Sequence, residues 1–324
     1  MAIQFRPAIR SNVNLLIGLA GTSGSGKTYS ALRLATGMAQ GRRFALIDTE
    51  NGRALHYADQ FPLFDHCDLH APFTPDRYAE AILAADAAGY PVIVVDSMSH
   101  EWAGEGGVLE WHETELTRMA GDDWKRREAC TMAAWIRPKQ NHRMLVQKLL
   151  QTKAHVIFCF RAEAKVEIAK DDKGKTIIRP KTSTIGLDGI MPISEKNLPY
   201  ELTVSLLMTA DAPGVPKPIK LQEQHRKLFP LEKAITEDSG MGVAAWAAGG
   251  SKAAEPVQGP THAVGEYLDP MPLFDAIRNA TTGSALREIS DRIAKLRLLD
   301  QDRINLREAG RQRVETLRIE RGAA

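Results

Sequence analysis

One eight-residue segment constrains the fold of this chain more than any other feature of its sequence. Residues 21–28 read GTSGSGKT and match the spacing GxxxxGK(S/T). An apolar run at residues 15–20 precedes the segment and predicts a buried strand, and apolar residues at helical spacing follow it. A strand, a glycine-rich loop and a helix in this order bind phosphate, because backbone N–H groups and the helix N-terminus face the anion.

The motif predicts a site for ATP and Mg²⁺. Lys27 is expected to reach the β- and γ-phosphates, and the hydroxyl of Thr28 to coordinate Mg²⁺. Asp96 ends the apolar run VIVVD and is the expected second magnesium ligand, with a helix-capping aspartate as the alternative interpretation. The predicted nucleotide-binding residues are Gly21, Thr22, Ser23, Gly24, Ser25, Gly26, Lys27, Thr28 and Tyr29.

The base that activates water is not adjacent to the magnesium ligand. Ser97 follows Asp96, at the position where many AAA+ ATPases carry a glutamate. Glu50 lies two residues past Asp48, at the carboxyl edge of the predicted sheet, where open α/β sheets bind their ligands. Glu50 is therefore the candidate base and Glu101 is its competitor; an exposed carboxylate without a role is the alternative for Glu50.

Arg161 is the third catalytic candidate, beside Lys27 and Glu50. It directly follows the apolar run at residues 155–160, so its side chain is expected at the same edge of the sheet, where it would sense the γ-phosphate. A surface arginine without a role is the alternative. The hypothesis therefore places all three catalytic candidates around one phosphate-binding loop.

The order of the predicted elements indicates an α/β fold. Apolar runs at 44–48, 90–95 and 155–160 alternate with helical patterns, which predicts a mainly parallel sheet flanked by helices. Short β runs around DDKGK predict a hairpin insertion with Gly174 at positive φ. The expected organisation is an N-terminal arm (1–11), an ATPase domain (12–235), a flexible linker (236–265) and a C-terminal helical tail (266–324).

The overall charge gives no evidence for nucleic acid or an anionic membrane as a partner. Forty-two basic residues and 40 acidic residues leave a net charge of +2, so any binding face must be local. Such a local excess occurs at residues 161–181, which contain seven basic and four acidic side chains. The candidate DNA-contacting residues are Lys165, Lys170, Lys173, Lys175, Arg179 and Lys181, although a solvated hairpin carries charges too.

Cysteine usage and hydropathy favour the cytoplasm. The three cysteines lie far apart and form no disulfide framework, which is typical of a reducing compartment. No apolar stretch approaches the roughly 18 residues of a transmembrane helix, so no membrane partner is expected.

The segments GTSGSGKT, FALIDTENG and VIVVDS resemble the RecA-like ATPase core, and more closely the phage AAA-domain nucleotide-binding proteins that include the Sak group of single-strand annealing ATPases. The resemblance covers about residues 12–235. It implies that Glu50 activates water, that the loops after the strand ending at Arg161 face single-stranded DNA, and that the protein forms a homo-oligomer. Lys217 and Lys220 are then candidates to reach a neighbouring subunit's nucleotide. Arg161 departs from the Asn-Gln pair of RecA itself.

The leading hypothesis is a phage or prophage ATPase that acts on single-stranded DNA in recombination or annealing, in the cytoplasm of the bacterial host. A P-loop kinase of small molecules or nucleotides is one alternative. The other is an ATP-dependent recruiter or loader that binds a single-strand-binding protein, or another recombination or replication protein, through the C-terminal helices.

Overall fold

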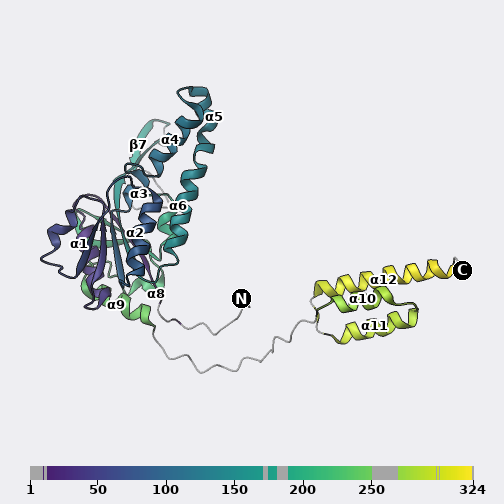
Figure 1. Ribbon diagram of the computed structural model, residues 1–324. Coiled ribbons are helices and arrows are strands. Elements are labelled where there is room, and N and C mark those ends of the chain that lie inside the picture. The colour runs from purple at the N-terminus through teal and green to yellow at the C-terminus, as the bar shows by residue number, and fades with distance from the viewer. Residues whose placement is uncertain are drawn as a thin grey trace. The chain divides into compact units, whose positions relative to one another are not determined.

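The computed structural model describes residues 10, 13–170, 174–180, 189–249, 269–296, 298 and 300–322. The chain divides into two compact units, Met1–Lys252 and Ala253–Ala324, which are described separately (Figure 1). The predicted residues Lys173 and Lys181, the N-terminal arm apart from Arg10, and most of the predicted linker lie outside the described residues.

The first unit is built on an eight-stranded sheet. Across the sheet the strands are β10 (Ala212–Lys220), β9 (Val204–Thr209), β1 (Leu16–Gly21), β5 (His155–Ala164), β4 (Val92–Asp96), β2 (Phe44–Asp48) and β3 (Phe64–Asp68). All neighbours on this path pair in parallel except β10, which is antiparallel to β9. The short strand β8 (Ile190–Pro192) pairs with the outer end of β5. The predicted α/β fold with a mainly parallel sheet is confirmed.

Helices cover both faces of the sheet, because alternate side chains of each central strand enter different cores. In β1, Ile17 and Leu19 join one apolar cluster, whereas Leu16 and Ala20 join the other. The first cluster is covered by α1 (Lys27–Ala39) and α9 (Glu237–Ala248), and the second by α2 (Pro75–Ala87) and α6 (Ile136–Leu149). The other helices described in this unit are α3 (Ser99–Ala103), α4 (Val108–Ala120), α5 (Trp124–Ala134), the 3₁₀ helix η1 (Arg53–Tyr57), α7 (Leu198–Glu201) and α8 (Glu223–Arg226).

Helix α9 corrects the expected domain boundary. The linker was predicted to begin at residue 236, but residues 237–248 form a helix that packs against α1. A Cβ atom on Gly240 would lie 2.2 Å from the carbonyl oxygen of Leu34, so only glycine permits this close approach. Arg33 also donates to Glu237 at 2.6 Å. The glycines and alanines of residues 237–248 therefore belong to a closely packed helix.

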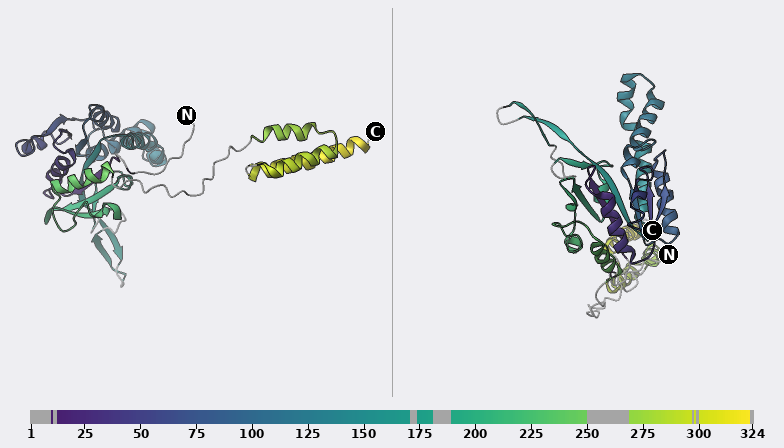
Figure 2. Two further views of the ribbon diagram at one scale, coloured as in Figure 1. Left: turned by 90° about the horizontal axis from the view of Figure 1, so that it is seen from below. Right: turned by 90° about the vertical axis from the view of Figure 1, so that its left-hand side faces the viewer.

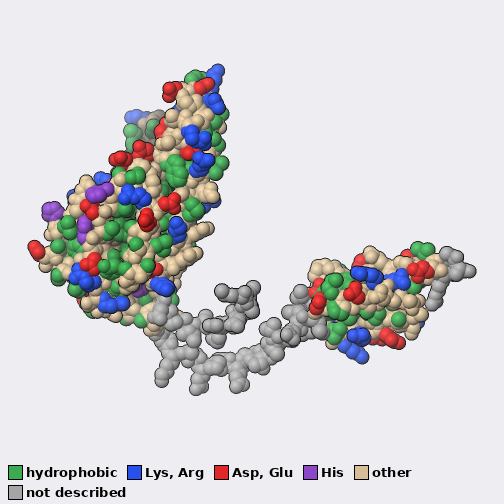
Figure 3. Space-filling model, in the orientation of Figure 1, with side chains coloured by type: hydrophobic (Ala, Val, Ile, Leu, Met, Phe, Trp, Pro, Cys, Tyr) green, Lys and Arg blue, Asp and Glu red, His purple; other side chains and the backbone are tan. Residues whose placement is uncertain are grey.

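Two projections extend beyond the carboxyl ends of the parallel strands (Figures 1 and 2). One is the predicted hairpin, formed by the antiparallel strands β6 (Val166–Lys170) and β7 (Thr176–Pro180), with Gly174 at φ +76° as expected. The other contains α4 and α5. Figure 3 shows charged side chains of both signs at its tip, and the exposed apolar residues Trp124, Met132 and Ile136 lie on this projection.

The second unit is a small helical unit, as predicted. It contains α10 (Met271–Asn279), α11 (Gly283–Lys295) and α12 (Asp300–Gly322). Thr282 caps α11 by accepting from the backbone N–H of Ala285, and Arg303 donates to the carbonyl of Leu296 at the other end of the helix. The unit's own core contains Leu273, Ile277, Ala280, Leu286, Ile293, Leu298, Leu306 and Leu317.

Within the part of the chain that the structure describes, no helix is long and apolar enough to cross a membrane.

Candidate functional site

The glycine-rich loop connects β1 to α1 at the carboxyl edge of the sheet. Gly26 adopts φ +80°, a left-handed conformation that favours glycine, and is the N-cap residue of α1. The backbone N–H and the side-chain hydroxyl of Ser25 both donate to the carbonyl oxygen of Thr22, which closes the loop. Lys27 Nζ lies 2.9 Å from the same carbonyl. The loop is thus folded as a compact phosphate cradle at a helix N-terminus.

Thr28 and Asp96 meet at the end of β4. The Thr28 hydroxyl donates to Asp96 Oδ2 at 2.5 Å, and Asp96 is only 5% exposed. Burial raises the pKa of the Asp96 carboxyl to about 6, against the opposing effect of the Thr28 hydrogen bond. A hydroxyl and a carboxylate side by side are oxygen ligands of the kind that Mg²⁺ prefers, and a bound cation would favour the ionised carboxylate. The donor set therefore fits the predicted metal.

Glu50 follows β2 and lines the same cleft as Lys27, Thr28 and Asp96. The backbone N–H groups of Glu50 and Ala54 donate to the carboxylate of Asp48, which is 1% exposed. This buried aspartate fixes the turn that presents Glu50. Arg53 forms an ion pair with Glu50 at 3.2 Å from the exposed side. The role of Asp48 as an anchor was not predicted from the sequence.

Glu101 lies outside the cleft. Its carboxylate is 1% exposed and lies 2.8 Å from Nδ1 of His142, on α6. Burial alone would lower the pKa of His142, but the hydrogen bond and the charge of Glu101 outweigh burial and raise it. Glu101 thus belongs to a buried ion pair between helices, whereas Glu50 lines the cleft.

Arg161 reaches the cleft from β5 and belongs to a polar network. Its backbone N–H donates to the Ser99 hydroxyl, and its guanidinium lies 3.4 Å from Nε2 of His100. Nδ1 of His100 lies 2.8 Å from the hydroxyl of Thr49, the residue before Glu50. Burial lowers the pKa of His100, and the positive charge of Arg161 lowers it further. Because arginine only donates, the neutral ring accepts at Nε2 and carries its proton on Nδ1.

Sequence reasoning missed this network because Thr49 and His100 are 51 residues apart. The only local signal is that each lies just past the end of a strand whose last residue is an aspartate, Asp48 or Asp96. Such positions meet at one edge of a parallel sheet. The network connects the turn that carries Glu50 to the strand that carries Arg161.

The cleft has a volume of about 810 Å³, within the usual range for small-molecule sites. Polar lining is provided by the glycine-rich loop, Lys27 and Asp96, and the lining also includes Tyr29 and Tyr57, whose rings lie 5.9 Å apart. The cleft is lined by Gly21, Ser23, Gly24, Gly26, Lys27, Thr28, Tyr29, Glu50, Arg53, His56, Tyr57, Asp96, Arg161, Ala162, Glu163 and Ile193. The predicted residues Thr22 and Ser25 form the loop but do not line the cleft.

The candidate DNA-contacting residues lie on or beside the hairpin, and none of those described lines the cleft. Lys165 pairs with Glu163 at 3.2 Å, and Arg179 pairs with Glu167 at 2.8 Å across the two strands. Lys170 lies at the end of β6, and Lys175 lies in the turn before β7. Elsewhere, Lys220 donates to the carbonyls of Tyr200 and Leu202 in its own chain, which gives it a structural role.

Comparison with known proteins identifies the family. A family model described as an AAA domain matches residues 14–194, which is more than half of the chain. The matched region includes the glycine-rich loop, Glu50, Asp96 and Arg161. No curated protein matches the sequence. The chain therefore belongs to the AAA domain family of P-loop ATPases, and this membership implies nucleotide binding and, in general, ATP hydrolysis.

Proposed function

We propose that this protein is a magnesium-dependent ATPase with a RecA-like core that acts on single-stranded DNA, in the recombination or strand annealing of a phage or prophage. One observation carries the proposal: strand β5 runs from the sheet, past the nucleotide cleft, to the base of the hairpin. Its residues 156–160 are buried, Arg161 and Glu163 line the cleft, and the hairpin starts at Val166. A change at the phosphate end of the cleft would therefore reach the hairpin through one continuous strand.

The binding step uses the glycine-rich loop and the pair of oxygen ligands. The loop's N–H groups and Lys27 would hold the phosphates, while Thr28 and Asp96 would hold Mg²⁺. The bound Mg·ATP supplies the phosphoanhydride bond that is hydrolysed. Tyr29 and Tyr57 offer an aromatic surface in the lining of the cleft, and both also pack against the apolar cluster beneath α1.

The chemical step assigns Glu50 to orient and polarise the attacking water. Its carboxylate faces the cleft, and Asp48 holds the turn on which it lies. Arg161 would stabilise negative charge that develops on the γ-phosphate. The contact between its guanidinium and Nε2 of His100, at 3.4 Å, would help to position it. His100 also contacts Thr49, the residue before Glu50. A shift of Arg161 would therefore also displace the turn that carries Glu50.

The hairpin is the proposed DNA-contacting element. Val166, Ile168 and Ile178 are 65%, 77% and 73% exposed, and strand pairing brings Ile168 opposite Ile178. This aliphatic face would pack against sugars and bases, while Lys165, Lys170, Lys175 and Arg179 would contact phosphates without reading sequence. Such binding weakens as salt is added, because the release of counterions from the DNA is less favourable in a solution that already contains more salt.

Phosphate release with and without a single-stranded oligonucleotide tests the proposal. Lys27→Ala should lower ATP hydrolysis by about a hundredfold or more, as expected when one phosphate-stabilising group is removed. Transfer of the γ-phosphate to a nucleoside phosphate instead of water would contradict the hydrolase and favour a kinase.

The hairpin is tested separately with Lys170→Glu combined with Lys175→Glu. This variant should lose DNA binding by about tenfold at moderate salt while ATP binding is unchanged. The matched control reverses Arg226 and Lys227, which are exposed at or after α8, at the other end of the first unit (Figure 1). Equal DNA binding by the two variants would remove the hairpin from the proposal but leave the ATPase intact.

A further inference from the structure

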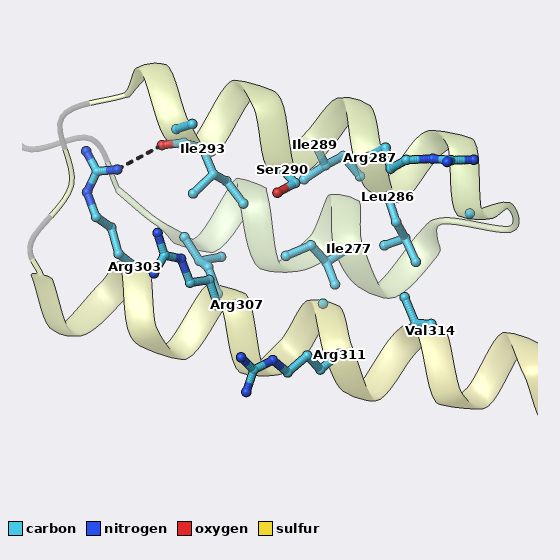
Figure 4. Close-up of a pocket in the computed structure, with 14 residues that line it drawn as sticks. Ile277, Leu286, Arg287, Ile289, Ser290, Ile293, Arg303, Arg307, Arg311 and Val314 are labelled. Carbon is cyan, nitrogen blue, oxygen red and sulfur yellow. Dashed lines mark hydrogen bonds between the residues drawn. The ribbon is translucent and has the colours of Figure 1, made fainter.

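The C-terminal unit contains a groove that the proposed ATPase cycle does not use. It has a volume of about 370 Å³ and lies between α11 and α12, with Ile277 of α10 at its floor (Figure 4). Leu286, Ile293 and Leu306 are buried beneath it, so the floor is aliphatic. The small residues Gly283, Ser290, Ala294 and Gly310 lie along the groove and leave room between the helices.

The charges around this groove have one sign. Four of its fourteen lining residues are arginines, and none of these described residues is acidic. This separation is notable because residues 266–324 as a whole carry 11 basic and 10 acidic side chains. None of the acidic side chains that the structure describes lines the groove, whereas four arginines do.

Three of the four arginines are available to a ligand. Arg303 donates to the carbonyls of Ile293 and Leu296 and so caps α11. Arg287 and Arg307 are exposed and have no ion-pair partner among the described side chains, and Arg311 lies 3.9 Å from Glu308. Figure 4 shows Arg287 at one end of the groove, Arg303 at the other, and Arg307 between α11 and α12.

We propose that this groove docks an acidic, amphipathic segment of a partner protein, with apolar side chains on the aliphatic floor and carboxylates on Arg287, Arg307 and Arg311. Apolar grooves between helices commonly bind segments whose apolar side chains recur at helical spacing. Complementary charge fixes the orientation of the bound segment. The rim arginines suit carboxylates because the guanidinium donates two parallel hydrogen bonds.

The lining favours a peptide over nucleic acid. Single-stranded nucleic acids bind through aromatic side chains on which bases stack, combined with a positive track. No aromatic or histidine side chain is among the groove's described lining residues, which are aliphatic, small or arginine apart from Ser290. An aliphatic floor rewards the burial of leucine or phenylalanine side chains from a peptide.

The test uses the full chain and a fluorescein-labelled peptide with leucines at helical spacing and aspartates between them. Arg287→Glu combined with Arg307→Glu should weaken its binding by about tenfold, since two attractive contacts become repulsive. The matched control is Arg278→Glu with Arg318→Glu: both arginines are exposed, each pairs with an acid three residues earlier, and neither lines the groove. This control should bind the peptide within about twofold of the unchanged protein.

A second variant tests the groove itself without changing charge. Ser290→Trp should fill the space between the helices and lower the affinity for the same peptide. The melting temperature of the chain should stay unchanged, because Ser290 is exposed. A peptide with lysines in place of the aspartates should not bind.

Three outcomes would overturn the proposal. The groove and control variants could lose affinity for the peptide equally, which would mean that only the overall charge of the unit matters. A single-stranded oligonucleotide could bind the unchanged protein and lose affinity in the groove variant as much as the peptide does, which would make the groove a nucleic-acid surface. Self-association that the groove variant alone abolishes, seen by sedimentation, would assign the groove to a second copy of the chain.

Discussion

The two units of the chain treat charged side chains in opposite ways. Among its described residues the first unit buries five carboxylates, and each has a partner: Asp48, Asp96, Glu101, Glu115 and Glu195 accept hydrogen bonds from backbone N–H groups, from the Thr28 hydroxyl, or from His142 and Arg118. No charged side chain of the second unit is buried among the residues described there. Burying an ion costs several kcal/mol before partners offset it.

This difference follows from the sizes of the two units. A sheet covered by helices on both faces buries enough apolar surface to offset a few desolvated charges, whereas the smaller second unit does not. Two of these carboxylates, Asp48 and Asp96, end strands at the edge of the sheet where the cleft lies, whereas Glu101 pairs with His142 outside it. The second keeps its described charged side chains at or near the surface.

The largest expected effect separates two carboxylates of the first unit. Glu50→Gln should lower the turnover of ATP by about a hundredfold or more while nucleotide binding and thermal stability stay unchanged, because the carboxylate acts on the water. Glu101→Gln should instead lower the free energy of unfolding by about 2 kcal/mol, because it weakens a buried pair. Phosphate release and urea unfolding of both variants measure the contrast; a loss of turnover confined to Glu101→Gln would exchange the two roles.

A second contrast compares glycines in helices of the two units. Gly240→Ala should destabilise the first unit by about 1–3 kcal/mol, since its Cβ atom would collide with the Leu34 carbonyl oxygen. Gly310→Ala should stabilise the second unit by about 0.5–1 kcal/mol, because nothing lies within 4 Å of the new atom and alanine favours a helix. Calorimetry of the full chain should register both shifts, and a loss at Gly310 would mean that α12 is packed there.

The smallest effect concerns pH. The pKa of His142 is raised in the folded state, so the pair with Glu101 stabilises the protein below the unfolded pKa of about 6.5, and this stabilisation is lost as pH rises through the folded value. The difference in unfolding free energy between the unchanged protein and His142→Gln should therefore shrink from pH 6 toward alkaline pH. Lys139, Glu195 and Trp102 also face this histidine. A difference that grows with pH would contradict the assignment.

Much of the candidate site could be predicted because its signals are local. The spacing of the loop fixes Lys27 and Thr28, and the ends of short apolar runs identify Asp96, Glu50 and Arg161 as neighbours at one sheet edge. The parallel sheet follows from the same alternation of elements. Strand β3 was missed because its sequence, FDHCD, has no apolar run. Only its first residue is buried, so the strand does not need one.

What could not be predicted depends on contacts between distant residues. Nothing near Glu101 indicates that His142 neutralises it, and nothing near Arg161 indicates His100. Helix α9 is an ambiguous case, since small residues suit both a linker and a helix that approaches another closely. The tryptophans also differ from one another: Trp102 and Trp135 stack 6.0 Å apart, whereas Trp124 is 68% exposed.

The direction of each side chain along β5 relates the residues of the cleft to those at the base of the hairpin. Side chains alternate along a strand, so Arg161, Glu163 and Lys165 share one face while Ala162 and Ala164 share the other. An insertion of one residue after Glu163 would leave the cleft unchanged and turn over every side chain at the base of the hairpin, whereas an insertion of two would restore the facing. The proposed coupling of cleft and hairpin therefore requires that the number of residues between Arg161 and the hairpin change only by an even count.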